Sequence, residues 1–480
     1  MCALLNPGNF GTIDTIRRLQ VERWIRAGEP AVRPDDTSLG LVGRNGVLYP
    51  PYGIGQSLVL LPFDAFVSGT VGHALRRFGL DAARREQIVE LSVAFLMQSF
   101  LTACLLMAAH AVLMSFGFDF LVSAVGALAL LFSTTCFQYV QCAQETLLLL
   151  VLALTALWAI RRYQLSGAGK FAALAGMAMG FAILVRLTSV LEAGVFGLLA
   201  LVMAKDRKKL FIGYGTPLAV AFLIDRWYQY YRFGELLSTY TGILERHSRM
   251  PNAPAQYMFS YPFWKGFLGA FYSPDKSILL FDPLLVVLLI LVAFGWRELD
   301  RALGTALAWL GVLLIAYLVF YAKYYFFGGG VSWGDRYVLM PVQVLCLFAV
   351  PILLTEARTL PRWVRRTLWA VVLASVLMQA GSTAIAPNLE VLQRDAGYRH
   401  GALWNRAVNI LEISRDREEP ARFQGVPVEW RTLYYFAFQL RFRFPVLARW
   451  AIGGWLILLV CLPVAVLGAL RAARAGVKPG

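Results

Sequence analysis

The chain has 480 residues, of which 58% are hydrophobic and only 15% are charged. This composition excludes an ordinary soluble globular protein and is typical of a chain that crosses a bilayer many times. The net charge of +16 does not indicate a nucleic-acid partner, because the basic residues are spread over short loops between apolar runs rather than gathered in one patch.

The first 90 residues are polar and turn-rich, and we predict that they form a segment outside the membrane. Asp14 opens an amphipathic helical pattern, and Asp35 and Asp36 form the only adjacent acidic pair of this segment. Tyr49 and Tyr52 flank two prolines, a pattern that predicts a rigid turn.

The stretch 56–80 is apolar but contains Pro62, Asp64 and Gly69, so its pattern favours interfacial helices over a clean membrane span. Further along lie runs close to the ~20 residues that a helix needs to cross a bilayer. These predicted spans cover residues 91–114, 119–137, 143–160, 170–187, 188–204, 210–228, 278–296, 304–323, 337–355, 366–387 and 448–470. We therefore predict an all-α polytopic membrane bundle of about 11–12 transmembrane helices, with interfacial helices in a first external loop.

The spans and the polar segments between them predict four parts. They are an external segment over 1–90, a transmembrane bundle over 91–387 with external loops at 229–277 and 324–336, an external segment over 388–446, and a last span with a cytoplasmic tail over 447–480. Neither of the two longest polar connections is large enough to indicate an independent domain.

Basic clusters in the short loops indicate the orientation. They lie at 161–170, 205–209, 356–366 and 471–480. Alternating the spans places all four clusters on one side, which the positive-inside rule makes cytoplasmic. The N-terminus then lies outside with no span to carry it across. We expect either that 56–72 crosses the membrane or that a further helix belongs in front of this sequence.

On this topology a set of charged residues lies at the outer face. A charge at membrane depth is costly and indicates a functional site. The set comprises Arg186, Asp225, Arg226, Lys276, Asp282, Asp335 and Arg336. Simpler interpretations remain: interfacial anchoring for an arginine, a mutual ion pair for Asp225 and Arg226, and a helix cap for Asp14.

Three other features bear on the site. Glu192 lies in an apolar run and is expected to pair with Arg186 only if the helix breaks between them. The aromatic run 321–327 predicts an interfacial belt. The four histidines and six cysteines show no metal-ligand spacing, so neither a metal nor another cofactor is predicted.

Several segments, taken in order, resemble the GT-C superfamily of membrane glycosyltransferases. The resemblance is nearest to the bacterial branch related to protein O-mannosyltransferases and to the lipid A aminoarabinose transferase. The segments are residues 11–30, 43–66, 180–191, 225–242, 267–287 and 328–341. In order and spacing they extend over most of the chain, from residue 11 to residue 341, and as an ordered set they are specific for the superfamily rather than for any substrate.

The resemblance implies an integral protein of the bacterial cytoplasmic membrane with its site facing the exterior. It implies transfer of a sugar from a polyprenyl-phosphate carrier to a glycan, lipid or protein acceptor. Asp14 occupies the place of the base that takes the acceptor's proton, with Asp35 or Asp36 as substitutes. The expected substrate-binding residues are Arg186, Lys276 and Arg336 for the phosphate, with Asp335, Tyr49, Tyr52, Asp225 and Arg226 around them.

Two other classes of function remain open. One is a polytopic transporter or lipid flippase, and the other is a non-catalytic GT-C-like accessory membrane protein. Transporters often contain inverted repeats with helices broken at matching places. The sequence shows no internal repeat, and its large polar segments fall on one side, which favours an enzyme.

Overall fold

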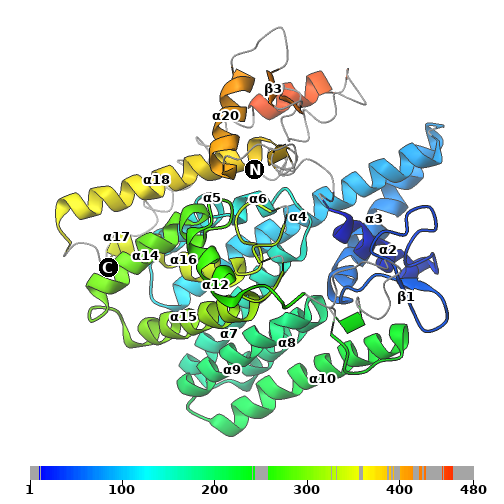
Figure 1. Cartoon of the computed structure of the whole chain (residues 1–480). Coiled ribbons are helices and arrows are strands. Elements are labelled where there is room, and N and C mark those ends of the chain that lie inside the picture. Colours follow the sequence, from blue (N-terminus) through cyan, green and yellow to red (C-terminus); the bar gives the residue numbers. More distant parts are fainter. Residues whose placement is uncertain are drawn as a thin grey trace.

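The protein is described from a computed structural model, which defines residues 10, 12–79, 81–239, 242–243, 258–325, 327–330, 332–355, 360–385, 389–390, 393, 401–414, 421–423, 426–428, 446 and 448–457. Figure 1 shows that helices make up nearly all of the regular structure in this part of the chain. The strands there form two short antiparallel hairpins, β1 (Leu41–Val42) with β2 (Leu48–Tyr49) and β3 (Ala421–Phe423) with β4 (Val426–Val428).

The predicted fold class, an all-α polytopic membrane bundle, is confirmed. The helices in chain order are α2 (Ile13–Ala27), α3 (Gly55–Arg77), α4 (Ala82–Ser115), α5 (Phe120–Phe132), α6 (Cys136–Tyr139), α7 (Glu145–Ser166), α8 (Gly169–Val185), η1 (Leu187–Ser189), α9 (Val190–Met203), α10 (Arg207–Phe233), α12 (Phe263–Tyr272), α13 (Ile278–Phe281), α14 (Pro283–Gly295), α15 (Arg301–Tyr321), α16 (Leu339–Cys346), α17 (Ala349–Thr355), α18 (Arg362–Ala384) and α20 (Ala402–Ser414). Among the described residues, α3, α4, α7, α15 and α18 are long and apolar enough to cross a membrane, and shorter apolar helices accompany them.

Helix α3 is continuous where the sequence suggested a break. Pro62 lies inside it and removes only one backbone hydrogen bond, which a helix packed among others tolerates. Asp64 is fully buried, and it forms ion pairs with Arg23 and Arg26 of α2. The charge that argued against a span is therefore paired by a neighbouring helix.

Two predicted spans each contain a break. The span at 278–296 is divided into α13 and α14 at Asp282, because Pro283 is the first residue of α14 and donates no backbone hydrogen bond. At this break, the Asp282 carboxylate accepts a hydrogen bond from the backbone N–H of Thr135, 2.7 Å away. The span at 337–355 is divided into α16 and α17. The predicted span at 448–470 lies outside the described residues beyond 457.

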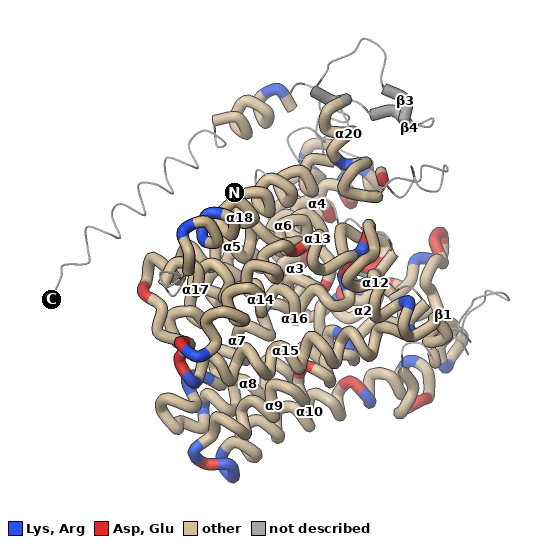
Figure 2. The backbone as a smooth tube through the Cα atoms, turned by 60° about the vertical axis from the view of Figure 1, so that its left-hand side comes forward, with Lys and Arg blue, Asp and Glu red and all other residues tan. Residues whose placement is uncertain are grey.

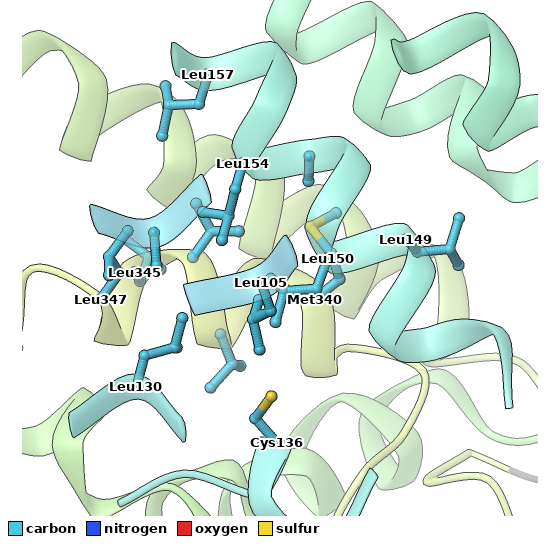
Figure 3. Close-up of a cluster of buried hydrophobic side chains, with 14 of the residues drawn as sticks. Leu105, Leu130, Cys136, Leu149, Leu150, Leu154, Leu157, Met340, Leu345 and Leu347 are labelled. Carbon is cyan, nitrogen blue, oxygen red and sulfur yellow. The ribbon is translucent and has the colours of Figure 1, made fainter. Parts of the chain in front are cut away.

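Helix α7 lies at the centre of the bundle. Figure 3 shows Leu150 and Leu154 of α7 beside Leu105 of α4 and beside Met340 and Leu345 of α16. All five side chains are buried. Because lipid tails are as apolar as leucine, close packing rather than exclusion of water stabilises such contacts inside a membrane.

Helices α8 and α10 approach each other through glycines. A Cβ on Gly176 would lie 2.3 Å from the carbonyl oxygen of Tyr214, and one on Gly180 would lie 2.8 Å from the Cβ of Ala221. Small residues at such contacts let membrane helices pack closely. This packing fixes the end of α8, where Arg186 follows.

Charged residues gather at two opposite sides of the bundle. In Figure 2, one side contains the charges around α2, β1 and α12, and the other contains the end of α7 and the starts of α10 and α18. The helices between them are almost free of charge in this view. A bilayer therefore fits between the two charged sides.

Candidate active site

Segments far apart in the sequence meet at one of these charged sides. The starts of α2 and α3 are bound to the start of α7, because Thr15 Oγ1 and Gln56 Nε2 both donate to the carbonyl of Ala143, at 3.2 and 2.6 Å. These two hydrogen bonds bring Asp14 at the start of α2 close to Glu145 at the start of α7.

The turn that carries Tyr52 lies directly on the end of α8. A Cβ on Gly53 would lie 2.2 Å from the carbonyl oxygen of Leu184, and one on Gly55 would lie 2.7 Å from the backbone nitrogen of Val185. Only glycine allows the two backbones to approach so closely. The contact brings Tyr52 to the same end of α8 as Arg186.

Four side chains form a connected chain of contacts in the site. The Tyr52 hydroxyl donates to Asp14 Oδ1 at 2.7 Å. The guanidinium of Arg18 lies over the Tyr52 ring, 4.5 Å from its centroid, and forms an ion pair with Glu145 Oε2 at 2.7 Å. Asp14 lies in the first turn of α2 but is not its N-cap, which is Thr12.

Two arginines share one tyrosine ring on the other side of the site. The guanidinium carbons of Arg186 and Arg336 each lie 5.2 Å from the centroid of the Tyr337 ring. Burial lowers the pKa of Arg336, but Tyr337, Glu145 and Asp14 nearby outweigh it and raise this pKa above its ordinary value. Arg336 therefore stays charged and interacts electrostatically with both carboxylates.

Lys276 holds the loop that presents Arg336. Its ammonium group donates to the carbonyls of Gly330, Ser332 and Gly334 at 2.8, 2.7 and 3.1 Å. It also donates to the Ser332 hydroxyl at 3.0 Å. The visible role of Lys276 is to fix this glycine-rich loop, and its predicted contact with the carrier's phosphate stays a prediction.

Asp335 lies in the same loop, outside the membrane-spanning helices. Its carboxylate accepts from the backbone N–H of Tyr337 at 3.0 Å. Burial raises the pKa of Asp335 to about 6, although hydrogen bonds and the neighbouring Lys276 and Arg336 act in the opposite direction. The side chain orders the backbone on either side of Arg336.

The predicted pair Asp225 and Arg226 lies at the end of α10 and is nearly buried. The two side chains form an ion pair with each other, and Arg226 Nη1 also donates to the carbonyls of Leu236 and Ser238 at 3.2 and 3.0 Å. These contacts hold the segment that follows α10, at residues 236–238, against the side of the helix.

The other predicted residues lie around α2. Tyr49 is buried, and its ring packs edge-to-face against Trp24 with the two ring centroids 5.6 Å apart. Asp36 forms an ion pair with Arg17 at 2.9 Å, while Asp35 is exposed on the same loop. Asp14 is therefore the predicted acidic residue that is hydrogen-bonded to Tyr52, whose ring in turn contacts Arg18.

Sequence reasoning missed Arg18 and Tyr321 as parts of the site. Arg18 follows Asp14 by four positions on a helix, and this spacing, which places both side chains on one face, is a signal that could have found it. Tyr321 belongs to the aromatic run predicted as an interfacial belt, yet it is buried and accepts a hydrogen bond from Arg186 Nη2 at 3.0 Å.

Residues 52–321, more than half of the chain, match the model of glycosyltransferase family 87. The chain belongs to glycosyltransferase family 87. This is a GT-C-type family, so the protein is a membrane glycosyltransferase. Comparison with curated proteins and with solved structures gives no match. Asp14 lies before the matched residues and Arg336 lies after them, so the match itself assigns no role to either residue.

Proposed function

We propose that this glycosyltransferase takes a sugar from a polyprenyl monophosphate carrier and transfers it to a hydroxyl of a glycan, lipid or protein. The observation that carries the proposal is the grouping of Asp14 with three guanidinium groups at one end of a membrane bundle. The side chain of Asp14 is partly exposed, as are those of Arg186 and Arg336, so a substrate can reach them.

The charges of the site favour a donor with one phosphate. Arg18, Arg186 and Arg336 contribute three positive charges, and Asp14 and Glu145 contribute two negative charges, which leaves 3 − 2 = +1. A sugar joined to a lipid monophosphate is a phosphodiester with one negative charge. A nucleotide sugar has a diphosphate with two charges, which this site would neutralise less completely.

The reaction follows from the two sides of the site. The acceptor oxygen forms a bond to the anomeric carbon, and its proton passes to the Asp14 carboxylate, whose Oδ1 is held by Tyr52. The bond between the anomeric carbon and the phosphate oxygen breaks, and its electron pair stays on that oxygen. Arg186 and Arg336 stabilise the charge that develops on the leaving phosphate.

The helix α12 supports a site at the membrane surface. Trp264, Leu268 and Tyr272 recur every four residues along it and are exposed on one stripe. Such a stripe suits a helix that lies in the lipid interface. The loop after α12 carries Lys276, so the helix connects the interface to the loop that presents Arg336.

We propose that the site faces the outside of a bacterial cytoplasmic membrane. The basic loops at 161–170 and 205–209 lie at the charged side opposite the site (Figure 2), and short basic loops stay in the cytoplasm. The narrower resemblance, to the protein O-mannosyltransferase and aminoarabinose transferase branch, stays a prediction.

The test is a choice of donor. The purified protein in lipid nanodiscs is given either a radiolabelled hexose on a polyprenyl monophosphate or the corresponding nucleotide sugar, together with extracted membrane lipids and glycans as acceptors. We expect transfer from the lipid-linked donor alone. Equal or faster transfer from the nucleotide sugar would overturn the proposal. The mass of the lipid-linked sugars that accumulate in cells lacking the protein identifies the sugar.

A further inference from the structure

Glu192 is an acid in the interior of the bundle. It lies in the first turn of α9 and is 1% exposed. Its Oε1 accepts a hydrogen bond from the Tyr317 hydroxyl on α15, and its buried Oε2 has no hydrogen-bond partner in the described part of the chain. The sequence suggested Arg186 as the partner of Glu192, but the hydrogen bond goes to Tyr317. An acid at this depth is costly to keep and indicates a role.

A second contact joins the same two helical segments one turn away. The Tyr321 hydroxyl donates to Thr188 Oγ1 at 3.3 Å. Thr188 and Glu192 are four residues apart, as are Tyr317 and Tyr321, so each pair lies on one face of its segment. The rings of Tyr317 and Tyr321 lie 5.9 Å apart. The segment formed by η1 and the start of α9 is thus joined to the end of α15 by two successive hydrogen bonds.

Arg186 depends on this pair of contacts for its orientation. It follows the last residue of α8 with an extended backbone, φ −152° and ψ 117°, so no regular helix fixes its direction. Its Nη2 donates to the Tyr321 hydroxyl at 3.0 Å, and the Tyr321 ring stacks on Tyr337 at 4.7 Å. Any shift of Tyr321 is therefore passed to the guanidinium of Arg186.

We propose that Glu192 is a positioning residue for the carrier's phosphate. By holding Tyr317, it fixes the end of α15 and with it Tyr321, which orients the guanidinium of Arg186 toward the site. This inference rests on the proposed function, in which Arg186 binds the phosphate. Hydrogen bonds to an anion depend on the direction of the donor, so a small displacement weakens binding without removing any group from the site.

The test measures binding of a polyprenyl monophosphate without sugar to the full-length protein in nanodiscs. Arg186→Ala should weaken binding by about tenfold or more, because it removes a charge-assisted hydrogen bond. Tyr317→Phe keeps the ring but removes the hydroxyl, and should weaken binding by about three- to tenfold. Glu192→Ala should behave like Tyr317→Phe, whereas Glu192→Gln keeps an acceptor and should bind within about twofold of the native protein.

Tyr214→Phe is the matched control. The Tyr214 hydroxyl donates to the carbonyl of Ala193, also on α9, at 2.7 Å. Like Tyr317→Phe, this substitution removes a tyrosine hydroxyl that donates a buried hydrogen bond to α9. Neither Tyr214 nor Ala193 is hydrogen-bonded to Arg186 or Tyr321 in the described part of the chain. We expect a similar fall in the thermal unfolding midpoint for the two phenylalanine variants, and no change in phosphate affinity for Tyr214→Phe.

The double variant of Arg186→Ala with Tyr317→Phe separates the possible outcomes. It should bind no more weakly than Arg186→Ala alone, because Tyr317 acts through Arg186. If the two substitutions weakened binding additively, or if Tyr214→Phe lost as much affinity as Tyr317→Phe, Glu192 and Tyr317 would only join helices. That result would overturn this inference but leave the proposed function standing. Native affinity in Arg186→Ala would instead refute the phosphate role in the proposed function, and this inference with it.

Discussion

Replacing Asp14 by asparagine separates catalysis from binding. The amide oxygen of asparagine can still accept the hydrogen bond that Tyr52 donates at 2.7 Å, so the side chain keeps its place. The amide cannot take the acceptor's proton. Turnover should fall by about 10²- to 10⁴-fold, which corresponds to about 3–5 kcal/mol of lost transition-state stabilisation. The net charge of the site rises from +1 to +2, so the KM for the anionic donor should not increase.

The assay is transfer of a radiolabelled sugar from a polyprenyl monophosphate donor by the protein in nanodiscs, with kcat and donor KM measured separately. Asp36→Asn is the matched control, because Asp36 belongs to the same external segment but is paired with Arg17 on a loop. It should retain most of the activity. Tyr52→Phe removes the group that orients Asp14 and should reduce turnover by about tenfold, less than Asp14→Asn.

Near-normal turnover in Asp14→Asn would refute the assignment. Asp14 would then act only as an acidic residue in the first turn of α2, where it stabilises the helix dipole. Loss of turnover in Asp36→Asn or Asp35→Asn, with Asp14→Asn active, would move the base to that loop. A rise in donor KM with unchanged kcat would show that Asp14 contributes to binding rather than to proton transfer.

Three further predictions concern the phosphate, the topology and a buried acid. Arg186→Lys and Arg336→Lys keep the charge but lose the planar fork, so each should bind polyprenyl monophosphate about tenfold more weakly. Native affinity in both Arg186→Ala and Arg336→Ala would show that these residues only anchor helices. In a background without other reactive thiols, an impermeant reagent should label Leu411→Cys in intact cells, and Arg207→Cys only after permeabilisation; labelling of position 207 alone would invert the topology. Burial raises the pKa of Asp335 to about 6, whereas the unfolded chain releases this proton near its ordinary pKa of about 4. The folded state should therefore lose up to about 3 kcal/mol as pH rises from about 4 to 6, and little beyond; an identical pH slope of thermal unfolding in Asp335→Asn would contradict this.

The apolar runs made most of the bundle predictable. A helix that crosses a membrane must satisfy its own backbone and present apolar side chains, so its length and composition are visible in the sequence. The places where the sequence misled are tertiary. Asp64 argued against a span over α3, but Arg23 and Arg26 from α2 pair with it. No local pattern shows that a charge in one helix is balanced by another helix.

The sequence predicted many of the residues that form the site, but it did not predict which of them contact one another. Arg18 and Glu145 are 127 residues apart, and their ion pair depends on the way α2 packs on the start of α7. Lys276 binds mainly backbone carbonyls, and carbonyl positions are not encoded by side-chain type. Tyr321 was assigned to an interfacial belt because aromatic residues near the end of a span are typical of one, whereas its hydroxyl orients Arg186.

The close approach at Gly53 gives a last prediction, which tests whether the turn carrying Tyr52 must lie on the end of α8. In Gly53→Ala the new Cβ would lie 2.2 Å from the carbonyl oxygen of Leu184, a backbone atom that cannot rotate away. The turn must shift, so we expect a loss of about 1–3 kcal/mol in stability and a fall in turnover, because Tyr52 orients Asp14. Gly69→Ala is the control: it lies within α3, no atom lies within 4 Å of the added Cβ, and alanine should stabilise the helix by about 0.5–1 kcal/mol. If Gly53→Ala matched Gly69→Ala in unfolding midpoint and turnover, the turn would not depend on this contact, and the link from the end of α8 to the proposed base would be wrong.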